Sequence, residues 1–165
     1  MDELVVGLLG ALARAAPRMH TLELIHASPA ALRAVTDMLA GRTVFSLARL
    51  DVVSADMDAD AAAALAAAVP ASLRWLICDV RKTLRECEPL LAVLVAAAAA
   101  RCPRLRVLRL AARRGDTSRE VVLATGRRLL AHACAAAPHL LASLHVYGDM
   151  LRITEAARKS THAGV

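Results

Sequence analysis

Three aspartates occupy alternate positions, Asp56, Asp58 and Asp60, a spacing that matches the start of an EF-hand calcium loop. The rest of that pattern is missing, because no glycine follows at the required position and no glutamate closes the loop. An alanine-rich run follows instead. Carboxylates ahead of such a run are typical of helix N-termini. We therefore predict that Asp58 or Asp60 begins a helix and that the three aspartates bind no metal.

The cysteines and histidines do not form a recognisable metal or catalytic pattern. The four cysteines are Cys78, Cys87, Cys102 and Cys134, and they form no CxxC pair and have no histidine at zinc-finger spacing. We expect them to be free, buried thiols, with disulfides as the alternative. His132 and Cys134 lie two residues apart on a predicted helix, and hence on different faces. The sequence also lacks a phosphate-binding glycine loop, GxSxG and HExxH. We predict that the protein is not an enzyme and needs no cofactor.

A short leucine pattern occurs five times along the chain. The copies are MHTLEL at 19–24, LARLDV at 47–52, LRWLIC at 73–78, LRVLRL at 105–110 and LASLHV at 141–146. Their starts are 28, 26, 32 and 36 residues apart, which lies in or just beyond the period of leucine-rich repeats. The alternation within each copy, and nearby Val52, Val53, Trp75, Ile77 and Val80, favour strands.

Helical patterns separate these copies, and each has start and stop signals. Ser28 with Pro29 begins one helix, residues 86–89 precede an aliphatic run, and Thr117 with Glu120 forms a capping box. Residue pairs that end in proline stop the helices at 16–17, 69–70, 102–103 and 137–138. The alternative is an alanine-rich helical bundle in which the leucine spacing is accidental.

The pattern resembles the leucine-rich repeat family over residues 2–150, in particular the ribonuclease-inhibitor and F-box-associated classes, whose repeats often contain a CPxLxxLxL segment like residues 102–110. The resemblance implies an α/β fold: a single domain over 1–165 that forms a short leucine-rich-repeat solenoid, with parallel strands on the concave side and helices on the convex side. Helices at 2–16 and 150–160 could cap its ends. The family's turn-bonding Asn or Cys is replaced here by Ala27, Ala55, Arg81, Arg113 and Asp149.

Side chains alternate along a strand, so the residues between the leucines are expected to project from the concave face. The five copies predict three rows: Thr21, Arg49, Trp75, Val107 and Ser143; Glu23, Asp51, Ile77, Arg109 and His145; Ile25, Val53, Asp79, Ala111 and Tyr147. The single Trp and the single Tyr both fall in these rows. Aromatic residues and Arg are favoured anchors of protein interfaces. The predicted partner-binding residues are Arg49, Asp51, Trp75, Ile77, Asp79, Arg109, His145 and Tyr147.

Positive charge is concentrated in one segment. Residues 1–100 carry nine basic and eleven acidic groups, whereas residues 101–128 carry nine arginines against Asp116 and Glu120. Such a cluster could bind phosphate or an acidic protein. Nucleic acid is disfavoured as a partner, because stacking aromatics and lysines are scarce and no recognition motif is present.

We expect an intracellular, cytoplasmic protein with no membrane association, because the uncharged stretch 129–148 is interrupted by polar residues and the N-terminus MDEL lacks a positive charge. The preferred function is a non-enzymatic interaction module that binds an unidentified protein partner on its concave face. The family resemblance adds recruitment of substrates for ubiquitination, although no F-box is visible before the first repeat. A decoy that mimics host repeats is an equivalent reading. The alternative is a homo-oligomer that assembles through open repeat ends.

Overall fold

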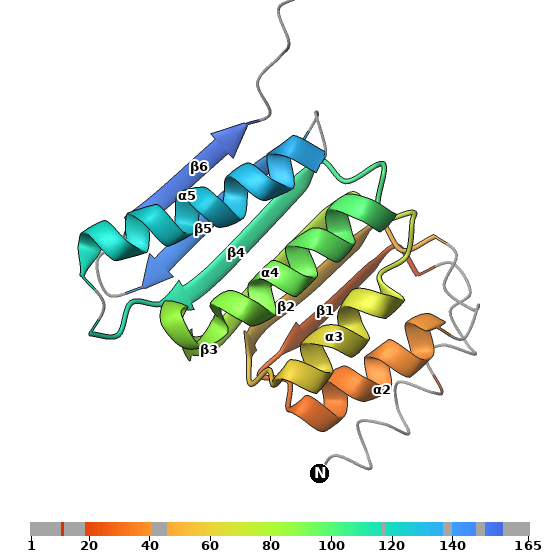
Figure 1. Ribbon diagram of the computed structural model, residues 1–165. Coiled ribbons are helices and arrows are strands. Elements are labelled where there is room, and N and C mark those ends of the chain that lie inside the picture. Colours follow the sequence, from red (N-terminus) through yellow and green to blue (C-terminus); the bar gives the residue numbers. More distant parts are fainter. Residues whose placement is uncertain are drawn as a thin grey trace, which may run out of the picture.

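The computed structural model describes residues 11, 19–40, 46–116, 118–136, 140–147 and 151–156. These residues form alternating strands and helices, apart from a final pair of strands (Figure 1). The strands are β1 (Thr21–Ile25), β2 (Arg49–Ala55), β3 (Trp75–Thr83), β4 (Val107–Arg113), β5 (Leu141–Tyr147) and β6 (Leu151–Ala156). The helices are α2 (Pro29–Ala40), α3 (Ala59–Ala68), α4 (Leu84–Arg101) and α5 (Arg119–Ala136).

The described elements form two layers, one of strands and one of helices. The sheet order is β1-β2-β3-β4-β5-β6, identical to the order in the chain. The first five strands are parallel, and β6 pairs antiparallel with β5. The four helices lie on one face of the sheet, where α2, α3, α4 and α5 pack side by side in that order (Figure 1). An α/β fold with a mostly parallel sheet is therefore confirmed.

The leucine pattern forms the core between the two layers. Leu22, Leu50, Leu76 and Leu108 are register partners on neighbouring strands, and the last three are completely buried. A second row of side chains points toward the helices beside the first and consists of Leu24, Val52, Cys78, Leu110 and Leu144. The helices pack leucine and many alanine side chains against these two rows. The small alanine side chains allow a helix to approach the sheet closely.

The starts of α2 and α3 follow the predicted capping chemistry, and α5 is capped by Ser118, one residue after the predicted Thr117. Ser28, Asp58 and Ser118 each precede a helix, and each side-chain oxygen accepts a hydrogen bond from the backbone N–H three residues later, at 3.2, 2.7 and 3.4 Å. Asp58 is thus the cap of α3, as one of the two predicted candidates. The backbone hydrogen bond, reinforced by a nearby arginine, lowers the pKa of the Asp58 carboxyl. Thr117, half of the predicted capping box with Glu120, lies outside the described residues.

Helix α4 begins earlier than the sequence indicates. Thr83 and Glu86 form a reciprocal capping box, in which the Glu86 carboxylate accepts hydrogen bonds from both the backbone N–H and the hydroxyl of Thr83. Pro89, predicted to mark the start, lies inside the helix. The predicted stops are confirmed where they are described, because α3 and α4 end just before Pro70 and Pro103.

The expected C-terminal helix at 150–160 is wrong, because Leu151–Ala156 is the strand β6. Within it Ile153 is buried, while Arg152 and Thr154 are exposed, which is the period of two that a strand requires. Pairing with β5 satisfies backbone groups that an edge strand would leave open. The expected N-terminal helix at 2–16 lies outside the described residues, except for Ala11.

Gly126 sets the distance between α5 and the last two strands. A Cβ atom at this position would lie 2.4 Å from Cδ1 of Ile153 and 2.9 Å from Cδ2 of Leu144. Both distances are shorter than a real carbon–carbon contact, so only glycine lets the helix lie this close to β5 and β6. The isolated glycine in the helical pattern is explained by this packing.

The turns after β1 and β2 satisfy their backbone groups with each other. The N–H of His26 donates to the carbonyl of Val53 at 2.9 Å, and the N–H of Asp56 donates to the carbonyl of Ala27 at 3.0 Å. His26 and Ser54 adopt positive φ angles of 55° and 51° in these turns. Backbone-to-backbone hydrogen bonds thus tie these two turns together.

Candidate partner-binding face

The face of the sheet opposite the four helices is called the open face here. No described helix lies against it (Figure 1). Strand pairing arranges its side chains in three rows: Thr21, Arg49, Trp75, Val107 and Leu141; Glu23, Asp51, Ile77, Arg109 and Ser143; and, with an irregularity between β2 and β3, Ile25, Val53, Asp79, Ala111 and His145. Tyr147 follows beside Arg113. All eight predicted partner-binding residues therefore belong to this face.

The predicted rows are wrong for the fifth strand. Leu141, not Ser143, is the register partner of Val107, and Ser143 rather than His145 is the partner of Arg109. The strand is displaced by two residues from the leucine alignment. Because side chains alternate with a period of two, such a displacement keeps every side chain on its face and leaves the alternating pattern unchanged. Only the strand pairing reveals it.

Exposed apolar side chains gather on the open face. Within the described residues, large apolar side chains that remain exposed on this face are Ile25, Trp75, Leu141 and Tyr147, at 59%, 36%, 49% and 47%. The others are Val93 on α4 and Val121 on α5. The prediction that the single Trp and Tyr project outward, rather than into the aliphatic core, is confirmed.

Arg49 and Asp51 form a bidentate ion pair on β2. Nε of Arg49 lies 3.0 and 2.9 Å from the two carboxylate oxygens of Asp51, and an Nη nitrogen lies 2.7 Å from Oδ2. The Asp51 side chain is only 6% exposed, whereas that of Arg49 is 47% exposed. The hydrogen bonds and the carboxylate charge raise the pKa of the Arg49 guanidinium. Asp51 therefore offers little free negative charge to a partner.

A second polar group spans three strands. The hydroxyl of Tyr147 on β5 donates to Oδ2 of Asp79 on β3 at 3.3 Å. The Tyr147 ring must cross β4 to reach it, and Ala111 on that strand has no side chain beyond Cβ to obstruct the ring. Partial burial and the Asp79 charge raise the pKa of Tyr147. Burial and the charges of Arg109 and Arg152 lower that of the nearby His145.

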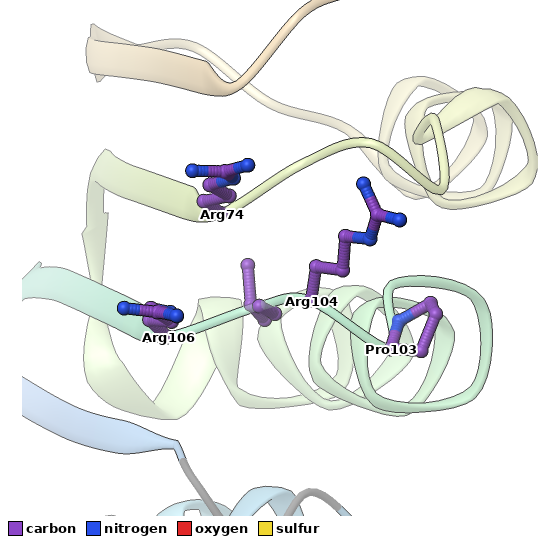
Figure 2. A pocket seen from close by; sticks show the side chains of 5 residues that line it. Arg74, Pro103, Arg104 and Arg106 are labelled. Carbon is purple, nitrogen blue, oxygen red and sulfur yellow. The ribbon is translucent and has the colours of Figure 1, made fainter.

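The basic segment does not form one continuous patch. Arg109 and Arg113 project from the open face, Arg128 pairs with Glu88 on α4, and Arg104 and Arg106 line a pocket at the start of β4. Arg74, at the start of β3, completes this pocket (Figure 2). Sequence reasoning missed Arg74 because it lies outside the basic segment. The repeat itself holds the signal, since Arg74 and Arg106 occupy the same position in LRWLIC and LRVLRL.

None of the four cysteines forms a disulfide in the described structure, as predicted. Cys78, Cys87 and Cys102 are buried and Cys134 is half-buried. Burial raises the pKa of Cys78 and of Cys87 to about 12 and that of Cys102 to about 11. Such thiols are protonated at neutral pH and act as small apolar side chains.

Among the described residues, no group of three or more His, Cys, Asp or Glu side chains could hold a metal ion. The described helices include none with the length and apolar character needed to cross a membrane. No protein-family model and no curated protein matches the chain.

Proposed function

We propose that the protein is a non-enzymatic interaction module of the leucine-rich-repeat type, a short arc whose open face is concave and binds a protein partner. Two features of the fold support a repeat origin. Each of the five leucine segments forms one strand, and the strands follow one another in chain order with helices on a single face. The register of Leu50, Leu76 and Leu108 is the stacking that such repeats require.

The observation that carries the proposal is the exposed row around Trp75. Parallel sheets are usually covered on both faces, but the described helices cover only one. Trp75 is 36% exposed in a row between Arg49 and Val107, with Ile77 two residues further along the strand. Tryptophan and arginine are enriched among residues that dominate binding energy. A partner that covers this row would bury apolar surface that the chain leaves in water.

The polar groups of the open face are suited to burial under a partner. Burying a charge is costly unless it is paired, and Asp51 is already held bidentately by Arg49. The carboxylate of Asp79 is likewise bound by Tyr147. Arg109 has no described carboxylate partner, so we expect the partner to present an acidic side chain near this position.

The test is a comparison of open-face and helix-face variants. Trp75→Ala and Arg49→Ala, immobilised and exposed to native extract, should lose specifically retained proteins that the unmodified chain retains. Val93→Ala and Val121→Ala serve as matched controls, because they remove exposed apolar side chains from α4 and α5. Circular dichroism and urea unfolding must show that each variant is folded. Equal retention by folded open-face variants and controls would contradict the proposed function.

Self-assembly is the second candidate, favoured by an exposed strand edge. Among the described strands, β1 and β6 lie at the edges of the sheet, and Ile25 on β1 is 59% exposed. Light scattering over a range of protein concentrations, with Ile25→Lys for comparison, tests this candidate. A monodisperse monomer at high concentration would exclude it, whereas an oligomer that Ile25→Lys dissociates would support it.

A further inference from the structure

The pocket at the starts of β3 and β4 is lined by three arginines, and its position differs from that of the open face. The lining residues are Arg74, Pro103, Arg104, Leu105 and Arg106, around a cavity of about 600 Å³. Arg74 and Arg106 stand at the beginnings of adjacent strands, and Arg104 extends from the segment before β4 toward the segment before β3 (Figure 2). Arg74 and Arg106 directly precede Trp75 and Val107, the first residues of β3 and β4, and both arginines are exposed.

Backbone hydrogen bonds fix these arginines next to one another. The N–H groups of Arg106 and Val107 both donate to the carbonyl of Arg74, at 2.9 and 3.1 Å. Before β4 the chain makes a tight turn in which the N–H of Leu105 donates to the carbonyl of Cys102 at 2.9 Å. Pro103, which has a fixed φ, is the second residue of this turn, directly before Arg104.

The equivalent turn before β3 is tied to this one. The N–H of Leu73 donates to the carbonyl of Pro70 at 3.0 Å, and the thiol of Cys102 donates to the same carbonyl at 3.4 Å. The hydroxyl of Ser72, in the turn before β3, donates to the carbonyl of Leu47 at 2.8 Å and so anchors this turn to the segment before β2. The backbone on both sides of the pocket is therefore held in place before any ligand arrives.

The positive charge in the pocket is uncompensated. Within the part of the chain that the structure describes, no carboxylate pairs with Arg74, Arg104 or Arg106. Like charges on neighbouring strands repel one another and destabilise the pairing. A bound anion would remove this repulsion. Three guanidinium groups present more donors than one carboxylate can accept, whereas the oxygens of a phosphate accept from several arginines.

We propose that the Arg74, Arg104 and Arg106 pocket binds the phosphate group of a phosphate monoester. The three guanidiniums would hold the phosphate oxygens, and Pro103 and Leu105 would contact the organic group that carries the phosphate. The cavity has the volume of small-ligand sites, and so leaves room for that group. The phosphate could belong to a free metabolite or to a phosphorylated side chain of a peptide.

Calorimetry on the full chain tests the proposal with inorganic phosphate and with free O-phosphoserine, at low ionic strength. Each of Arg74→Gln, Arg104→Gln and Arg106→Gln should weaken binding about tenfold, the usual effect of losing a charge-assisted hydrogen bond. Arg119→Gln and Arg127→Gln are matched controls, because both residues are exposed on α5 and do not line the pocket. The controls should bind as the unmodified chain does.

Absence of binding by the folded protein, or equal weakening by the α5 controls, would overturn the proposal. A five-residue peptide with a central phosphoserine between alanines distinguishes the two sources. Tighter binding of the peptide than of free phosphoserine assigns the site to a phosphorylated protein, and equal or weaker binding assigns it to a small ester. Loss of the peptide's binding when the phosphoserine is replaced by aspartate would support the phosphate requirement. A single-stranded oligonucleotide that binds regardless of the three substitutions, while phosphoserine does not bind, would also overturn the proposal.

Discussion

Replacement of Leu76 by alanine tests the core that the leucine pattern builds. Leu76 is completely buried on β3, between its register partners Leu50 on β2 and Leu108 on β4. The substitution removes three side-chain carbons, which at about 0.8 kcal/mol each is a loss of about 2.4 kcal/mol. The neighbouring leucines are held by their own strands and cannot collapse into the space, so a cavity adds about 1–2 kcal/mol. We expect the free energy of unfolding to fall by about 4 kcal/mol.

Urea unfolding followed by circular dichroism measures this loss, with Ile77→Ala as the matched control. Ile77 is adjacent in the chain but projects from the half-buried open face, where no closed cavity forms. We expect the control to lose only about 1 kcal/mol. Leu76→Val removes a single carbon, and its free energy of unfolding should lie between those of the unmodified chain and Leu76→Ala. This variant keeps the comparison measurable if the alanine variant is largely unfolded. Equal losses for Leu76→Ala and Ile77→Ala would refute the assignment of alternate faces, and with it the stacked core.

Three further predictions concern the thiols, pH and one close contact. In the folded protein at about pH 8, iodoacetamide should react slowly with the thiols whose pKa burial raises, and rapidly after guanidinium unfolding; mass spectrometry should find little alkylation of Cys78, Cys87 and Cys102. Burial, then Arg109 and Arg152, hold the pKa of His145 below 6.5. The imidazole of His145 is therefore protonated more readily in the unfolded chain than in the folded one. Its contribution to the free energy of unfolding is fully present above about pH 6.5 and is lost as the pH falls. The His145→Gln variant should show a weaker decline in urea titrations at successive pH values. Gly126→Ala should lower the free energy of unfolding by about 1–2 kcal/mol, because the added Cβ would lie 2.4 Å from Cδ1 of Ile153. Ile153→Val lacks Cδ1 and should relieve part of this loss in the double variant. Simple additivity of the two single losses in urea unfolding would contradict the contact.

The open face could be predicted well in membership and poorly in arrangement. Alternation along each strand places Trp75 and Tyr147 outward, and both are exposed. The contact between Tyr147 and Asp79 depends on two strands that β4 separates, so no local pattern indicates it. The pair of Arg49 and Asp51 lies two residues apart on one strand, a spacing that places both on one face but does not reveal how closely they bind.

The arginine pocket shows a similar division. The turn before β4, with Pro103 ahead of Arg104, is legible in the sequence because proline fixes the backbone there. The approach of Arg74 is not, since it comes from the preceding strand and joins the others only through register. The composition of residues 101–128 predicted one cluster of positive charge. In the structure the arginines of that segment are distributed over the open face, α5 and the pocket.

By itself the sequence determined that the five leucine segments become strands and which face of the sheet their side chains belong to. A period of two with leucine at fixed positions can bury an apolar face only in a sheet, and proline and capping residues define the helices between. The tertiary structure decided the register of β5, the identity of β6 as a strand and the neighbours of each charged side chain. A displacement by two residues preserves every alternation, so nothing in the local pattern opposes it. Packing of α5 through Gly126 against Leu144 and Ile153 is the kind of long-range contact that selects among such registers.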